Sequence, residues 1–315
     1  MRREKTRAFA PATVANVAVG FDLLGFAIEG AGDSVAVIRE PRKSGVAIDS
    51  IEGVVTDLPA EPERNTASAA LLAMIEDLGI SGGFRISISK GIPLGSGLGG
   101  SAASAVAAVV AANGLLERPL ENDRLLPYCL AGEKVASGAA HADNAAPCLL
   151  GGLIAVVSPD PPRIVSIPVP ADLVCVLVHP HLEIETRQAR AALRSEVPLS
   201  LVVQQSMYLS GFLAGCYAGD AELIGRSMVD LLAEPTRAPL IPGFEEARSA
   251  ALAHGALGMA ISGSGPSVFA WAPADAGPQV REAMRKVFAG RGLEADGWVS
   301  PIGRRGARLE PEVPG

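Results

Sequence analysis

Aromatic residues are scarce in this chain: Phe, Trp and Tyr together make up 4% of its 315 residues. Hydrophobic residues still make up 49%, so the sequence predicts a sizeable core built from Ala, Val, Leu and Ile. Basic residues are outnumbered by acidic ones, and the net charge is −7. Because nucleic acids and anionic membranes are bound by basic surfaces, we expect neither as a partner.

Closely spaced cysteines and long apolar runs near the start are also absent. No long apolar run follows residues 1–5, so we expect no signal peptide and no membrane span. The length suggests two domains or one large one. The cysteines lack the spacing of metal ligands, and we interpret them as reduced core residues of a cytoplasmic protein: Cys129, Cys148, Cys175 and Cys216.

Glycine, in contrast, is concentrated in residues 91–104, G-I-P-L-G-S-G-L-G-G-S-A-A-S. Apolar and polar side chains alternate over residues 84–90, which predicts a strand before the loop. The Ala/Val run after it predicts a buried helix that ends at Gly114. A glycine loop that opens a helix can hold phosphate on backbone N–H groups, although a plain turn is the simpler interpretation.

Three phosphate motifs compete for this loop. A P-loop needs Lys after its last glycine, and here Ser101 follows Gly100. The dinucleotide fingerprint G-x-G-x-x-G matches at Gly95, Gly97 and Gly100. It also needs a second strand ending in an acid about 20 residues later, where this chain has only Glu117 in a polar turn. An NAD-binding oxidoreductase is therefore the weaker alternative.

The third motif, P-x-x-x-G-L-G-x-S-A-A over residues 93–103, resembles the ATP loop of the GHMP kinases. Gly100 stands where that family usually has Ser, whereas Ser101 is retained. Asn65 reads as a helix N-cap, and the resemblance also puts it near the adenine. The resemblance implies an ATP loop made of Pro93, Leu94, Gly95, Ser96, Gly97, Leu98, Gly99, Gly100, Ser101, Ala102 and Ala103.

A metal site is suggested by Glu133, which falls at the end of a helix predicted over residues 122–134. An acid there is unfavourable to the helix dipole, which hints at another role. The resemblance implies that Ser101 and Glu133 hold Mg²⁺, a cation that prefers few protein oxygens together with waters and phosphates.

Residues 11–25, P-A-T-V-A-N-V-A-V-G-F-D-L-L-G, resemble the first motif of homoserine kinases in particular, with Ala18 in place of its first glycine. Residues 141–147, 186–190 and 234–242 are similar to three further segments of that family. Taken alone, Asn16 and Asp22 read as turn or helix caps, and a surface Arg as solvated. The resemblance instead implies a substrate site of Asn16, Asp22, His141, Thr186, Arg190 and Arg237, with Asn16, Asp22, His141 and Asn144 in catalysis.

The sequence alone does not identify the residue that accepts the proton of the substrate hydroxyl. Some GHMP kinases use an Asp as general base, and the resemblance puts Asn144 at that point, where no proton can be taken up. Asp22, His141 and Asp143 are the nearby candidates. We predict no dedicated base, so that the hydroxyl proton passes late to the transferred phosphoryl group or to water.

The resemblance covers nearly the whole chain and implies an α+β, two-domain GHMP kinase fold. It comprises a ribosomal protein S5 domain 2-like N-terminal domain at residues 1–163 and a ferredoxin-like C-terminal domain at residues 164–315, joined at a proline-rich connector. The loop at residues 263–266 is expected to fold against the ATP loop. The implied function is Mg²⁺-dependent transfer of the ATP γ-phosphoryl to L-homoserine in threonine biosynthesis, by a cytoplasmic homodimer. Another GHMP-type small-molecule kinase and a non-enzymatic descendant are the alternatives.

Overall fold

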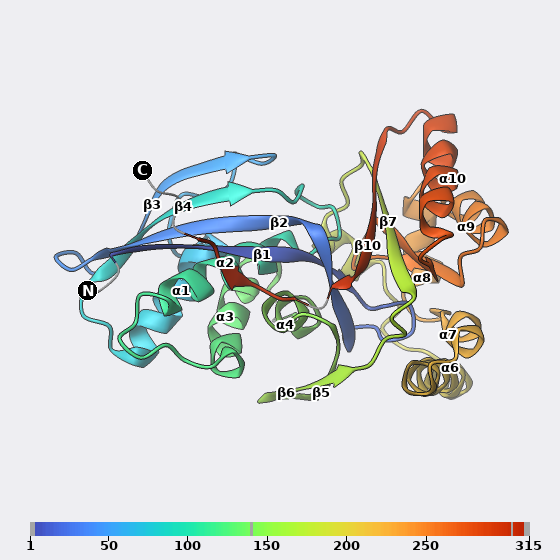
Figure 1. The fold of residues 1–315 in the computed structure, drawn as a ribbon, viewed down its shortest axis with the longest axis horizontal. Helices are drawn as coiled ribbons and strands as arrows, with labels where there is room; N and C mark the ends of the chain where they lie inside the picture. Colours follow the sequence, from blue (N-terminus) through green and yellow to red (C-terminus); the bar gives the residue numbers. More distant parts are fainter. Residues whose placement is uncertain (1–3, 139–140, 304, 312–315) are drawn as a thin grey trace.

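The structure is a computed structural model that describes residues 4–138, 141–303 and 305–311 (Figure 1). Its strands join in one sheet whose longest path runs β11-β1-β2-β10-β7-β9-β8, while β4 and β5 also pair with β2, β3 with β4 and β6 with β5. The strand bounds are β1 Lys5–Ala15, β2 Leu24–Glu40, β3 Gly45–Gly53, β4 Gly83–Lys90, β5 Leu153–Pro159, β6 Pro162–Ile167, β7 Leu173–Pro180, β8 Gly258–Ile261, β9 Val268–Pro273, β10 Ala295–Gly303 and β11 Arg308–Leu309.

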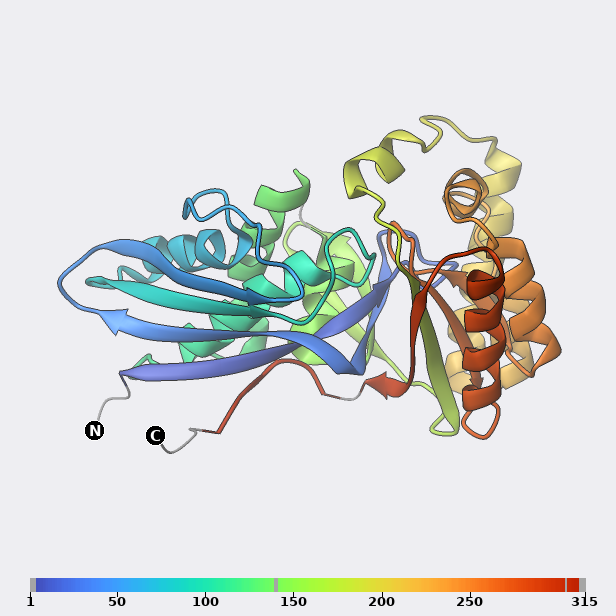
Figure 2. The same cartoon turned by 90° about the horizontal axis from the view of Figure 1, so that it is seen from above.

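The sheet has a first half, made of β1 to β6 and β11, and a second half, made of β7 to β10, and helices cover the two halves differently (Figures 1 and 2). In the first half α1 to α4 form a layer on one side of the sheet, in which α2 and α4 pack on β1 and β2. In the second half α9 and α10 cover one face, and α6 lies on the other with α7. The bounds are α1 Thr66–Leu78, α2 Gly100–Asn113, α3 Leu126–Ser137, α4 Ala142–Leu150, α5 Thr186–Ala191, α6 Leu199–Ala218, α7 Ala221–Ser227, α8 Glu234–Arg237, α9 Phe244–Ala253 and α10 Gly277–Gly290, with short 3₁₀ turns η1 Asn122–Leu125 and η2 Ala238–Leu240.

The first half depends on small side chains. Every residue of α2 from Ala102 to Asn113 is buried, so this Ala-rich helix is enclosed by the sheet and its neighbouring helices. A Cβ on Gly132 would lie 2.5 Å from the Thr66 carbonyl oxygen, because α3 packs closely on α1. Asn65 caps α1 through its side chain, as predicted, and Gly79 ends that helix in the left-handed conformation.

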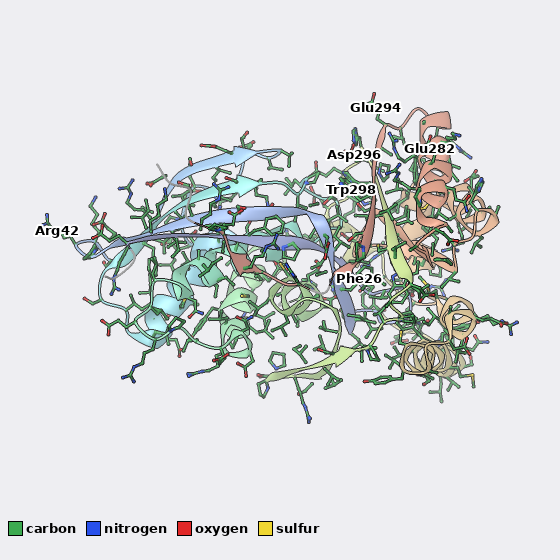
Figure 3. All side chains as sticks on the ribbon, in the orientation of Figure 1. Phe26, Arg42, Glu282, Glu294, Asp296 and Trp298 are labelled. Atoms are coloured by element: carbon green, nitrogen blue, oxygen red, sulfur yellow. The ribbon has the colours of Figure 1, made fainter. Side chains whose placement is uncertain are left out.

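Four aromatic side chains pack together where the two halves meet. Phe26 of β2, which Figure 3 labels, makes edge-on contacts with Phe269 and Trp271 of β9. Its ring centroid lies 5.7 and 5.8 Å from theirs. Phe212 of α6 also packs on Trp271, with ring centroids 5.3 Å apart. The opposite face of β9, with Val268 and Ala270, belongs to the core under α9 and α10. Because successive side chains of β9 point to opposite faces of the sheet, this one strand contributes to two hydrophobic cores.

Several expected elements differ in the structure. Gly and Asp turn residues predict separate strands over residues 26–29 and 34–40, but residues 24–40 form the single strand β2, which continues through Gly30 at a φ of 103°. The prolines at 158–162 lie in the β5–β6 hairpin and not in an extended connector. The sequence predicts a helix over residues 221–232, but α7 ends at Ser227. Helices also form at residues 142–150 and 244–253, where none was predicted. The domain bounds stay a prediction.

The fold also decides between the loop motifs. A dinucleotide-binding unit requires a second strand soon after the helix, but α2 is followed by η1, α3 and α4 before β5 begins at Leu153. The oxidoreductase alternative is therefore wrong. In the described ranges no helix combines the length and the apolarity that a membrane crossing needs.

Candidate active site

A cavity of about 610 Å³ runs along the glycine-rich loop and is lined by both halves of the chain. The first half supplies the loop, the 16–22 turn and the start of α4. The second half supplies α5, α8 and the loop after β8, and Figure 2 shows the α5 segment reaching over toward the first half. The motifs that the resemblance singled out in separate parts of the sequence therefore meet at one cavity.

The loop presents backbone to this cavity. Gly95, Gly97 and Gly99 take φ values of 61°, 75° and 67°, a region that side chains disfavour. The helix α2 starts after Gly99 without a side-chain cap, so its first N–H groups are available to an anion. This geometry suits the phosphates of a nucleotide.

The loop at residues 262–266 lies directly on the glycine-rich loop, as the sequence predicted. Ser262 Oγ donates a hydrogen bond to the Gly97 carbonyl oxygen at 2.7 Å. A Cβ on Gly97 would lie 2.4 Å from the Ser262 carbonyl oxygen. Gly97 is thus required by packing between two loops, a constraint that the sequence alone did not suggest.

A buried ion pair, Asp33 with Lys90, is hydrogen-bonded to both ends of the glycine-rich loop. Lys90 Nζ donates to Asp33 Oδ2, to the Gly100 carbonyl oxygen at 2.8 Å and to Ser104 Oγ at 2.9 Å. Asp33 Oδ1 accepts the Gly91 N–H at 3.0 Å. Asp33 and Lys90 are 0% and 7% exposed. The sequence did not lead us to predict this pair. Lys90 follows Phe84, Ile86 and Ile88 at every second position of β4, and therefore points to the same buried face.

Ser101 and Glu133 come together at the start of α2, where they were predicted to bind a metal. Glu133 is buried, lines the cavity and is hydrogen-bonded to Ser101. Burial raises the pKa of Glu133 to about 7. A carboxylate and a hydroxyl facing a phosphate-binding loop match the oxygen donors that Mg²⁺ takes. The described part of the chain holds no group of three or more His, Cys, Asp and Glu residues that could bind a metal by themselves.

Charged side chains from three motifs meet at the other end of the cavity. Arg190 makes two hydrogen bonds to the Asp22 carboxylate, at 2.9 and 3.1 Å. Arg237 is buried, donating to the carbonyl oxygens of Ala189 and Gly263, and burial lowers its pKa. Both guanidinium groups lie over the Phe21 ring, at 5.6 and 5.3 Å from its centroid. Two cations and one anion therefore face a single small volume.

Asn16 lies in this cavity but uses its side chain to hold the structure. Its Nδ2 donates to the Gly263 carbonyl oxygen at 3.0 Å, and its Oδ1 accepts the Asp22 N–H at 3.0 Å. Asn16, Val17, Ala18 and Asp22 all have positive φ, which is costly for non-glycine residues. The strained turn holds Asp22 toward Arg190, and the φ of 58° at Ala18 explains why the related motif has glycine there.

His141 is a neutral hydrogen-bond donor in this arrangement. Burial lowers its pKa, and the charge of Arg190 lowers it further. Arg190 Nη2 lies 3.5 Å from His141 Nδ1. Because arginine only donates, this contact favours the tautomer in which Nδ1 accepts and Nε2 carries the proton. His141 Nε2 is buried and meets no hydrogen-bond partner among the described residues.

Comparison with known proteins identifies the family. Two family models match, the GHMP kinases N terminal domain over residues 65–152 and the GHMP kinases C terminal domain over residues 212–290. A homoserine kinase from Xanthomonas campestris pv. campestris is 52% identical over 310 residues, covering 97% of this chain and 94% of that protein. The chain belongs to the homoserine kinases of the GHMP kinase family.

Solved structures agree with this membership. The crystal structure of homoserine kinase from Cytophaga hutchinsonii superposes on this GHMP kinase with a TM-score of 0.95 at 46% identity, covering 98% of each chain. L. major mevalonate kinase in complex with R-mevalonate, at 18% identity and a TM-score of 0.70, shares the fold. The two-domain α+β GHMP kinase fold predicted from the sequence is confirmed.

Two residues that were predicted to bind ligands, Asn65 and Thr186, are placed less directly at the cavity. The Asn65 amide donates to the Pro59 carbonyl oxygen at 3.0 Å and accepts the Ala67 N–H at 3.1 Å, so it holds the loop beside the cavity. Thr186 is exposed and lies 3.4 Å from Ser264 Oγ at the rim. Both line the cavity, but only Thr186 keeps a side chain that a ligand can reach.

Proposed function

We propose that this kinase transfers the γ-phosphoryl group of ATP to the side-chain hydroxyl of L-homoserine. The observation that carries the proposal is the pair formed by Asp22 and Arg190, with Arg237 beside it, across the cavity from the glycine-rich loop. An α-amino acid carries one carboxylate and one ammonium group. When such a substrate binds, the Asp22–Arg190 ion pair can be replaced by two ion pairs with the substrate. The substrate carboxylate then pairs with arginine and its ammonium group with Asp22.

The other end of the cavity suits ATP. The phosphates would lie on the N–H groups at the start of α2, in the loop that includes Gly95, Gly97 and Gly99. Leu58, Pro59 and Val135 line the cavity near Asn65 and offer apolar surface to the adenine. These placements rest on the resemblance and the cavity lining together.

Mg²⁺ is proposed as the metal, held by Ser101 and Glu133. When bound, Mg²⁺ neutralises the phosphate charge that grows in phosphoryl transfer. The chain's own contribution is the carboxylate of Glu133, kept at the phosphate end by burial and by its hydrogen bond to Ser101.

No residue is proposed to be a dedicated base. The contact with Arg190 favours the His141 tautomer that carries its proton on Nε2, and that tautomer does not take up a proton there. Asp22 is occupied by Arg190, and by the substrate ammonium when substrate is bound. The residues position the hydroxyl, and its proton leaves late, to the transferred phosphoryl group or to water.

ADP release across a panel of acceptors tests the function. Homoserine, mevalonate, shikimate and galactose are supplied in turn with ATP and Mg²⁺, and homoserine is expected to give by far the highest kcat/KM. A different acceptor in first place would keep the kinase and reject the amino-acid site. O-phosphohomoserine in the product mixture, identified by mass spectrometry, completes the assignment.

Arg190→Ala and Arg237→Ala are expected to raise KM for homoserine by roughly 10- to 100-fold, since each removes a charge-assisted hydrogen bond to the carboxylate. KM for ATP should change little. Steady-state kinetics with each substrate varied separately measure both values. Arg226→Ala, at an exposed Arg of α7 paired with Glu222, is the control. A parallel rise of both KM values would contradict the carboxylate assignment.

The cellular setting follows as part of the same proposal. O-phospho-L-homoserine is the expected product, and we place the enzyme in threonine biosynthesis in the cytoplasm. The cysteines suit a reducing compartment, because Cys129, Cys148, Cys175 and Cys216 are all buried free thiols.

A homodimer is expected, and α6 offers a surface for it. None of its 20 residues is charged, and Leu199, Met207 and Tyr217 are 78%, 66% and 63% exposed. Sedimentation equilibrium should give twice the monomer mass for the native chain. Met207→Lys, which places a charge in this surface, should shift the equilibrium toward monomer. A native chain that sediments as a monomer would reject the dimer.

A further inference from the structure

Thr13 joins three parts of the active site: β1, the glycine-rich loop and α4. Its backbone N–H donates to the Leu98 carbonyl oxygen at 3.1 Å. Its hydroxyl donates to Asn144 Oδ1 at 2.8 Å. Thr13 is 0% exposed, and a Cβ on Gly99 would lie 2.1 Å from the Thr13 hydroxyl oxygen. The hydroxyl therefore sits between the Asn144 amide and the residue that caps α2.

This hydrogen bond sets which end of the Asn144 amide meets the cavity. An amide side chain carries an accepting oxygen and a donating NH₂ group. Since Oδ1 is taken by Thr13, the NH₂ group is left for the cavity that Asn144 lines. His141 lines the same cavity. A neutral donor held toward the reacting oxygens favours an oxygen that gains negative charge.

We propose that Thr13 is a positioning residue, which fixes the Asn144 amide with its NH₂ group toward the reacting oxygens. The proposal rests on phosphoryl transfer as the function and identifies what holds one of its donors in place. Without the hydroxyl the amide is free to turn over. Its oxygen would then face an electron-rich acceptor or phosphoryl oxygen, which is repulsive.

Thr13→Val tests this, since valine has the shape of threonine without the hydroxyl. We expect kcat to fall about 10- to 100-fold, the size of effect that a small misplacement of a reacting group produces. KM for ATP should stay close to the native value, because the backbone N–H bond to Leu98 remains. Thr13→Ser, which restores the hydroxyl, should recover most of kcat.

The chain provides a matched control on the same strand. The Thr6 hydroxyl is also buried and donates to the Ala111 carbonyl oxygen at 2.6 Å, near the far end of α2. Thr6→Val should lower the melting temperature about as much as Thr13→Val does, and leave kcat at the native level. An equal loss of kcat in both variants would show that Thr13 is merely structural.

A double-mutant cycle with Asn144→Ala decides whether Thr13 acts through Asn144. We expect Thr13→Val to lower kcat in the native background and to have little further effect once Asn144 is Ala. Losses that multiply would overturn the proposal. If Thr13→Val does not fold, Thr13→Ala carries the same cycle. The cycle is run on whichever acceptor releases ADP fastest, so an error in the acceptor leaves this test intact.

Discussion

Glu133→Gln is expected to lower kcat by about 10²- to 10³-fold, because the carboxylate is one of the two oxygen ligands proposed for Mg²⁺ and several kcal/mol of charge stabilisation depend on that metal. Glutamine keeps the size of the side chain. Ser101→Ala should lower kcat in the same direction by removing the other ligand. Turnover at saturating ATP and homoserine measures both effects.

A binding measurement separates metal loss from misfolding. Calorimetric titration with ADP, with and without Mg²⁺, should show that the native protein gains affinity from the metal and that Glu133→Gln gains much less. Glu76→Gln, at an exposed position of α1, is the charge-matched control and should behave as the native protein. Native turnover in a folded Glu133→Gln protein would remove Glu133 from the metal site.

The nucleotide loop was predictable from the sequence because its signals are local. Alternation over residues 84–90, the glycines after it and the apolar run of α2 lie within thirty residues, and each follows from backbone geometry. The structure has the strand, the loop and the helix at these places. The helix at residues 142–150 was missed, since its polar start reads as loop and Pro147 lies inside it.

Contacts between distant segments were not predictable in this way. Asp33 and Lys90 are 57 residues apart, and nothing in either segment indicates the other. The resemblance placed Asp22 and Arg190 at one substrate, but their direct pairing appears only when segments 168 residues apart are brought together. The same holds for Asn16, whose amide was expected to face substrate and is used to hold Gly263 and Asp22.

Lys90→Met is expected to destabilise the protein by about 3–5 kcal/mol, because it leaves the Asp33 carboxylate buried without its cation. In a chain of this size, that corresponds to a fall in melting temperature on the order of 10 °C. Lys43→Met, at an exposed position between β2 and β3, is the control and should melt close to the native protein. Calorimetric or fluorescence melting curves measure both.

The double variant Asp33→Asn/Lys90→Met tests the reason for the loss. Removing the remaining charge should recover part of the stability, so the double variant should melt above Lys90→Met. Both the single and the double variant should bind ADP more weakly than the native protein. The reason is that both lack the hydrogen bond from Lys90 to the Gly100 carbonyl oxygen, which fixes the start of α2. A Lys90→Met protein that melts with Lys43→Met would show that the pair contributes nothing to the fold. Native ADP affinity in the double variant would show that the loop does not depend on it.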